Sequence, residues 1–66
     1  MTRQFGKGVT LDNPAFIHET ALVYGNVKIA EGVSLWPYVV IRSEMHHVSI
    51  GKRTNIQDFV MIHVGN

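Results

Sequence analysis

Residues 21–41, ALVYGNVKIAEGVSLWPYVVI, repeat a pattern of six residues in which a small apolar residue stands two places before a larger aliphatic one. The larger positions continue along the chain, with one shift of three residues after Ile41, as Ile17, Val23, Ile29, Leu35, Ile41, Ile50, Ile56 and Ile62. Only Thr54 breaks the rule for the small positions, which are otherwise Ala15, Ala21, Val27, Val33, Val39, Val48 and Val60. A fixed period predicts a stack of repeated units.

Within each unit the apolar residues alternate with polar ones, as in Val27-Lys28-Ile29, which is typical of a short strand with one buried face. Turn-forming pairs such as Gly25-Asn26 and Glu31-Gly32 separate the strands. A period of six is typical of hexapeptide β-helices, in which three units complete one triangular coil. We therefore predict an all-β fold, a parallel β-helix of about two and two-thirds coils; such helices are usually left-handed.

The same pattern predicts how the chain is divided. Residues 1–14 are expected to form a lead-in segment and residues 15–66 the hexapeptide-repeat β-helix domain. The three extra residues that shift the pattern are expected to form a short inserted loop at 43–47. Insertions at the corners of repeat proteins commonly carry function.

Composition excludes several classes of site and partner. The 66 residues contain no cysteine, so disulfides and thiolate metal sites are absent from this sequence. Six basic and five acidic residues are scattered and give a net charge of +1, which argues against a nucleic-acid partner. The apolar runs are too short for a membrane span or a signal peptide, which predicts a soluble, cytoplasmic protein without a membrane partner.

The outward positions predict a subunit interface. With three units per coil, one face presents an apolar column of Leu22, Val40 and Met61. A chain this small builds little core, and an aligned apolar column suits contact with another copy. One step beyond each inward aliphatic residue, the same face carries Tyr24, Arg42 and His63. Imidazole is a common zinc ligand, and the nearby carboxylate and amide of Asp58 and Gln57 could orient a ligand or a water.

Two segments carry a resemblance to a known family. Residues 35–44, LWPYVVIRSE, and residues 48–58, VSIGKRTNIQD, followed by His63, resemble the amino-terminal part of the gamma-class carbonic anhydrase family. The family motif has the form I-W-P-x-x-V-x-R-G-D, then I-G-x-x-T-N-I-Q-D, then a zinc-binding histidine five residues later. The resemblance implies trimers of left-handed β-helices with zinc held between adjacent subunits.

Site roles follow from this resemblance residue by residue. His63 matches the first zinc-binding histidine, and Gln57 matches the glutamine that hydrogen-bonds the zinc-bound water. Arg42 and Asp58 match an ion-pair network between subunits, and Asn55 matches a polar residue beside it. The implied chemistry is hydration of carbon dioxide, for which zinc lowers the pKa of water to about 7.

The sequence departs from the family in two places. Ser43-Glu44 replaces Gly-Asp, and the family takes its other two zinc histidines from a coil beyond Asn66. We therefore expect a truncated gamma carbonic anhydrase-like protein that keeps the β-helix and the oligomer interface, without a complete zinc site. Its expected partners are copies of itself, as a trimer or a dimer of trimers, joined through open coil ends and an interface of Leu22, Val40, Met61, Arg42 and Asp58.

Two alternatives remain open from the sequence. The first is a zinc-dependent carbonic anhydrase whose metal ligands are completed by other chains, with His46 and His47 of the inserted loop as possible additional ligands. The second is a fragment resembling hexapeptide acyltransferases, which shares the six-residue period but not the motif from Thr54 to Asp58.

Overall fold

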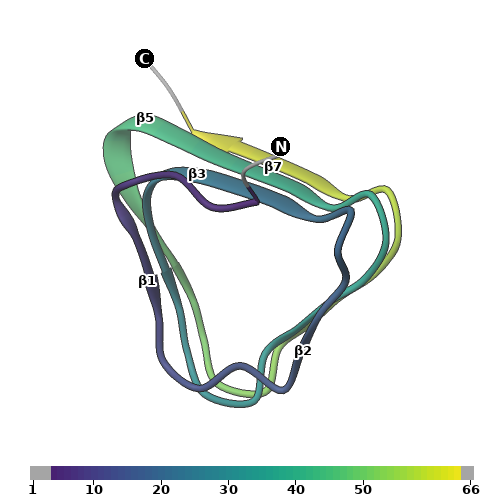
Figure 1. The fold of residues 1–66 in the computed structure, drawn as a ribbon. Helices are drawn as coiled ribbons and strands as arrows, with labels where there is room; N and C mark the ends of the chain where they lie inside the picture. The colour runs from purple at the N-terminus through teal and green to yellow at the C-terminus, as the bar shows by residue number, and fades with distance from the viewer. Residues whose placement is uncertain (1–3, 65–66) are drawn as a thin grey trace.

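The computed structural model describes residues 4–64, in which all regular structure is β-strand. The strands form two parallel sheets, one ordered β1-β3-β5-β7 and the other β2-β4-β6, and the chain winds around a triangle (Figure 1). Within this part of the chain, no helix is long and apolar enough to cross a membrane. The strands are β1 (Val9–Leu11), β2 (Phe16–Ile17), β3 (Leu22–Ile29), β4 (Ser34–Leu35), β5 (Val40–Ile50), β6 (Asn55–Ile56) and β7 (Met61–Val64).

Each strand pairs with the strand one coil later. Val23 of β3 lies opposite Ile41 of β5, and the separation of 18 residues equals three units of six. Ile41 in turn lies opposite Ile62 of β7, which is 21 residues later, because β5 contains the three additional residues. The structure confirms the predicted all-β fold, a left-handed parallel β-helix in which each coil stacks on the one before.

The segment before Pro14 also takes part in pairing. Phe5 forms a parallel bridge with Val23, and β1 pairs with the second half of β3. The backbone N–H of Gly6 donates to the carbonyl oxygen of Val23 at 2.9 Å. The N–H of Val23 donates to the carbonyl oxygen of Gln4, also at 2.9 Å. Part of the predicted lead-in segment therefore covers the open edge of the first full coil.

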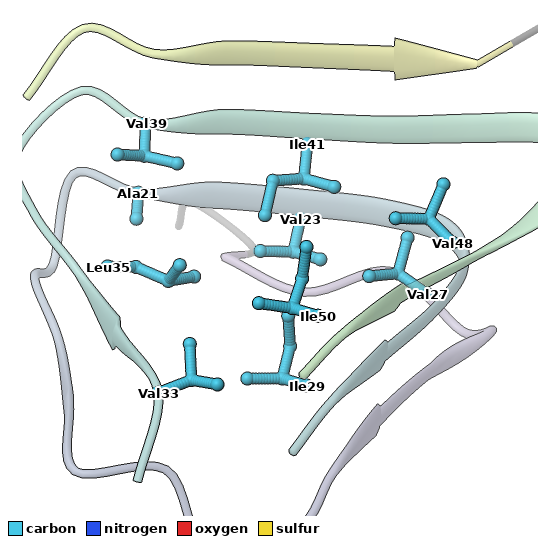
Figure 2. Packing of buried hydrophobic residues seen from close by; sticks show 10 residues of the cluster. All are labelled: Ala21, Val23, Val27, Ile29, Val33, Leu35, Val39, Ile41, Val48 and Ile50. Atoms are coloured by element: carbon cyan, nitrogen blue, oxygen red, sulfur yellow. The ribbon is translucent and has the colours of Figure 1, made fainter. Parts of the chain in front are cut away.

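The core occupies the inside of the triangle and consists of the inward residues of the six-residue pattern. In Figure 2 these side chains lie above one another in columns, so that Ile41 packs over Val23. Burying each aliphatic side chain stabilises the fold by about 1.5–3 kcal/mol. In the last coil the corresponding Ile56 and Ile62 are only half-buried. The buried cluster is Ala21, Val23, Val27, Ile29, Val33, Leu35, Val39, Ile41, Val48 and Ile50.

At one corner of the triangle, two aromatic residues adopt left-handed backbone angles. Tyr38 and Phe59 have φ angles of 62° and 63°, which cost about 1–2 kcal/mol each for a residue with a side chain. Their rings stack with centroids 5.3 Å apart. The N–H of Tyr38 donates to Oγ1 of Thr20 at 2.9 Å, and the N–H of Phe59 donates to the carbonyl oxygen of Pro37 at 3.1 Å. These contacts offset the backbone strain.

Candidate functional site

The inserted residues form a bulge within a continuous strand. Gly25 of β3 lies opposite Ser43 of β5, but Val27 lies opposite Val48, so Asn26 alone faces residues 44–47. Ser43 points inward, is 1% exposed, and donates its hydroxyl hydrogen to the carbonyl oxygen of His46. Figure 1 shows β5 making a wider bend than β3 at this corner. The buried Ser43 therefore ties the two ends of the bulge together.

Three side chains stand in register on the outer face beside this bulge. Tyr24 lies opposite Arg42, and Arg42 lies opposite His63, as the six-residue period predicted. Because successive strand residues point to opposite faces, these residues face outward when their neighbours Ile41 and Ile62 face the core. The parallel register thus places a phenol, a guanidinium and an imidazole in one column across three coils.

Glu44 completes this group from the next outward position of β5. Its Oε1 lies 2.8 Å from Nε2 of His63, across from one coil to the next. The hydrogen bond from His63 lowers the pKa of Glu44 below its usual value, and the charges of His63 and Arg42 lower it further. Both side chains remain open to solvent, with His63 39% and Glu44 59% exposed.

A depression in the surface adjoins the pair. It has a volume of about 540 Å³ and is lined by residues of β3 and β5, namely Tyr24, Gly25, Arg42, Ser43 and Glu44. Glu44 therefore lines the depression and also contacts His63.

The other residues predicted for the site lie elsewhere on the coil. Asn55 belongs to β6 in the second sheet, where its Oδ1 accepts a hydrogen bond from Nε1 of Trp36. Gln57 and Asp58 are exposed in the turn before β7 begins. The structure brings Arg42, Glu44 and His63 together in this chain, and their roles, like those of Asn55, Gln57 and Asp58, remain predictions.

The two histidines of the bulge point to different surroundings. The ring of His47 lies between Asn26 and Ser49, with Nδ1 3.2 Å from Oδ1 of Asn26 and Nε2 2.7 Å from Oγ of Ser49. His46 is exposed. Across residues 4–64, no group of three or more histidine, cysteine or acidic side chains is placed to hold a metal ion. The donors that this region brings together are His63 and Glu44.

The contact between Glu44 and His63 was not predicted from the sequence. The signal was present, because Glu44 is the next outward residue after Arg42 and lies diagonally across from His63 in the neighbouring coil. The sequence analysis missed this contact because residues 43–47 were expected to form a loop outside the strand. In the structure β5 runs through these residues without a break in strand backbone.

The predicted apolar column also forms on the outer surface. Leu22 lies opposite Val40, and Val40 lies opposite Met61, so the three side chains follow one line across β3, β5 and β7. Leu22 and Val40 are partly buried, and Met61 is 59% exposed. The column lies on the same strands as Arg42 and His63.

Comparison with known proteins identifies related sequences. Over 61 residues, 92% of this chain and 30% of the relative, it is 46% identical to Protein YrdA of Escherichia coli K12. It is 42% identical over 60 residues to Gamma carbonic anhydrase 1, mitochondrial, of Arabidopsis thaliana, covering 91% of this chain and 22% of that protein. Identity to Carbonic anhydrase of Geobacillus kaustophilus is 38% over 58 residues, covering 88% and 32%.

The chain spans less than a third of the length of these relatives. No family model and no solved structure matches it.

Proposed function

The chain belongs to the gamma carbonic anhydrase-like family of hexapeptide-repeat proteins, and from this we propose that its residues supply the β-helical scaffold, a subunit interface and one part of a zinc site. The observation that carries the proposal is the column of Arg42 and His63 beside the apolar column, with Glu44 in contact with His63. In this proposal the 66 residues do not complete the zinc site by themselves.

The chemistry of the donors fits part of a zinc site. Imidazole nitrogen and carboxylate oxygen are both zinc ligands, and a tetrahedral site needs four donors. His63 supplies one accessible donor, so the remaining ones must come from other residues or from water. Zinc, when bound, would lower the pKa of its water, so that hydroxide would be available near neutral pH to attack carbon dioxide.

The surrounding residues suggest what this chain contributes to such a site. His63 would hold the cation, and the opposite charges of Arg42 and Glu44 would fix the local electrostatic potential. Arg42 and Asp58 would pair with residues of a neighbouring subunit, and Gln57 and Asn55 would provide polar groups near the site. These assignments extend the family resemblance to the positions at which this sequence matches it.

Replacing His63 with alanine tests the metal-binding part of the proposal. We expect the variant His63→Ala to lose zinc affinity by at least about tenfold, because a ligand nitrogen is removed from an exposed position where folding is little affected. Isothermal titration calorimetry with zinc chloride measures the change. His18→Ala is the control, since it removes an imidazole that bonds Thr20 and has no proposed role at the metal. Equal losses in both variants, or none in either, would contradict the proposal.

The alternative function is a zinc-dependent carbonic anhydrase whose site is completed by other chains. It is favoured by the position of His63 and Glu44 on the strands that carry the apolar column, because a second copy docked there could bring further ligands. Stopped-flow measurement of carbon dioxide hydration with added zinc separates the two functions. Activity that disappears in His63→Ala supports the enzyme, whereas zinc binding without hydration supports the scaffold.

We propose that the column of Leu22, Val40 and Met61 mediates assembly into a trimer or a dimer of trimers. The column is continuous across three coils and lies beside charged groups that could pair across an interface. A cytoplasmic location remains a prediction.

A lysine at Met61 is expected to weaken this assembly. Met61 is 59% exposed in one chain, so Met61→Lys leaves the fold of the chain intact but places a charge in the proposed interface. The oligomer should dissociate at concentrations about tenfold or more above those for the unchanged protein. Sedimentation velocity over micromolar concentrations measures this.

Thr10→Lys is the matched control, because Thr10 is an exposed strand residue outside the apolar column. It should leave the assembly unchanged. An unchanged protein that is monomeric at micromolar concentration would refute the interface.

A further inference from the structure

We propose that the apolar column of one copy of this chain packs against an aromatic corner on a second copy. The inference rests on the proposed assembly and names the surface that the column meets. The corner lies where the chain passes from β2 to β3, from β4 to β5 and from β6 to β7 (Figure 1). Its aromatic residues are Phe16, Trp36, Tyr38 and Phe59.

Aromatic side chains gather on this part of the surface and not in the core. Of the six phenylalanine, tryptophan and tyrosine residues in the chain, four belong to the corner, whereas the buried cluster within residues 4–64 is entirely aliphatic. The ring centroids of Phe16 and Trp36 are 5.1 Å apart, and Tyr38, which stacks on Phe59, is 57% exposed. Exposed apolar clusters mark interaction sites, and aromatic residues are enriched at the centres of interfaces.

The backbone of the corner suits glycine or asparagine, yet it carries large rings. In the turns 36–39 and 57–60, the N–H of the fourth residue donates to the carbonyl oxygen of the first at 3.4 Å. The third residue, Tyr38 or Phe59, has a positive φ, as in a type II turn, where glycine and asparagine cost least. Stacking and hydrogen bonds offset this strain but leave the rings exposed, as a binding surface requires. Strained positions of this kind cluster at functional sites.

The symmetry of a trimer gives the column a partner different from itself. In a cyclic trimer each copy uses one surface toward one neighbour and a different surface toward the other, and the two surfaces converge near the threefold axis. The column therefore needs a second surface close to it on the same chain. The aromatic corner fulfils this condition, because Val40 and Met61 of the column follow Tyr38 and Phe59 by two residues.

The charges beside the two surfaces favour this pairing. The turns of the corner contain the exposed acidic residues Glu19 and Asp58, and no lysine or arginine. On the strands of the column, the next outward position of β5 carries Arg42, while Glu44 is bonded to His63. A corner packed on a neighbouring column brings Asp58 toward a guanidinium, whereas a corner packed on another corner would bring carboxylates together.

Replacing Tyr38 with asparagine tests the inference. Tyr38→Asn removes the exposed ring at a position where asparagine tolerates the left-handed backbone, so the chain should remain folded in urea denaturation. We expect its oligomer to dissociate at concentrations at least about tenfold above those for the unchanged protein, as measured by sedimentation velocity. Arg53→Asn is the matched control, because Arg53 is exposed and has a φ of 59° at another corner. It should leave the assembly unchanged.

Mixing two variants identifies which surfaces meet. Tyr38→Asn keeps the column and Met61→Lys keeps the corner, so the two kinds of chain together can form one intact contact but no closed ring. We expect native mass spectrometry to detect a mixed two-chain complex at concentrations at which each variant alone is monomeric.

The possible results separate this inference from the proposed assembly. Weaker assembly of both Tyr38→Asn and Met61→Lys, together with a mixed complex, supports contact between corner and column. If Met61→Lys dissociates the oligomer but Tyr38→Asn does not, or if the mixture contains no mixed complex, the inference is overturned while the proposed assembly stands. An equal loss in Arg53→Asn would also overturn the inference. An unchanged protein that is monomeric would overturn both.

Discussion

Alanine at Gly25 is expected to destabilise the β-helix by about 3 kcal/mol or more. Gly25 has a φ of +91°, and a Cβ atom built there would lie 1.7 Å from the carbonyl oxygen of Ser43. The obstacle is backbone, so no side-chain rotation can relieve it. To fit the methyl group, β3 and β5 would have to separate at the beginning of the bulge and lose the pairing of Gly25 with Ser43.

Gly51→Ala provides the matched comparison for this effect. A Cβ atom there would have its nearest neighbour, Oγ1 of Thr54, at 3.9 Å, which is an ordinary contact. Urea denaturation at one chain concentration should show a large loss for Gly25→Ala and a change within about 1 kcal/mol for Gly51→Ala. Equal midpoints for the two variants would show that the close approach of the coils at Gly25 is relieved at little cost.

Alanine at Ile41 is expected to remove about 3–4 kcal/mol of stability. Ile41 is fully buried in the middle coil, with Val23 and Ile62 as its register partners on the two sides. Its truncation leaves a cavity between fixed strands, which the parallel ladder prevents from collapsing. Since small domains have limited stability, this variant is expected to be largely unfolded at temperatures that the unchanged protein tolerates.

Ile62→Ala separates burial from residue type, because it makes the same chemical change one coil later in the same column. Ile62 is only half-buried, so its loss should cost about 1–2 kcal/mol. Thermal unfolding followed by circular dichroism gives both values. A loss for Ile62→Ala as large as that for Ile41→Ala would mean that the last coil is covered by another molecule in solution.

Most of the fold could be predicted from periodicity, because a β-helix repeats one local rule. Alternation within units such as Val33-Ser34-Leu35 predicts strands, and the period of six predicts which residues share a column. The core confirms this, since its buried residues occupy the inward positions of the pattern. The shift after Ile41 also indicated where three additional residues lie. The left-handed backbone of Tyr38 and Phe59 was not predicted, because neither residue type signals a positive φ.

The candidate site could be predicted only in part. The column of Tyr24, Arg42 and His63 follows from counting 18 residues over the regular coil and 21 over the coil that contains the three additional residues. The pairing of Glu44 with His63 does not follow from counting. It depends on how the bulge is accommodated, and a loop that left the strand would have carried Glu44 away from the neighbouring coil.

The sequence by itself determined the period, the inward columns and the outward alignment of Arg42 with His63, because these depend on the alternation of strand residues and on counting units of six with one shift of three residues. Only the tertiary structure decided that β5 continues through the bulge with Ser43 buried beneath it, and that Glu44 meets His63. The physical reason is that a local pattern specifies which face a side chain occupies, whereas contact across coils depends on how an irregular segment packs against its neighbours.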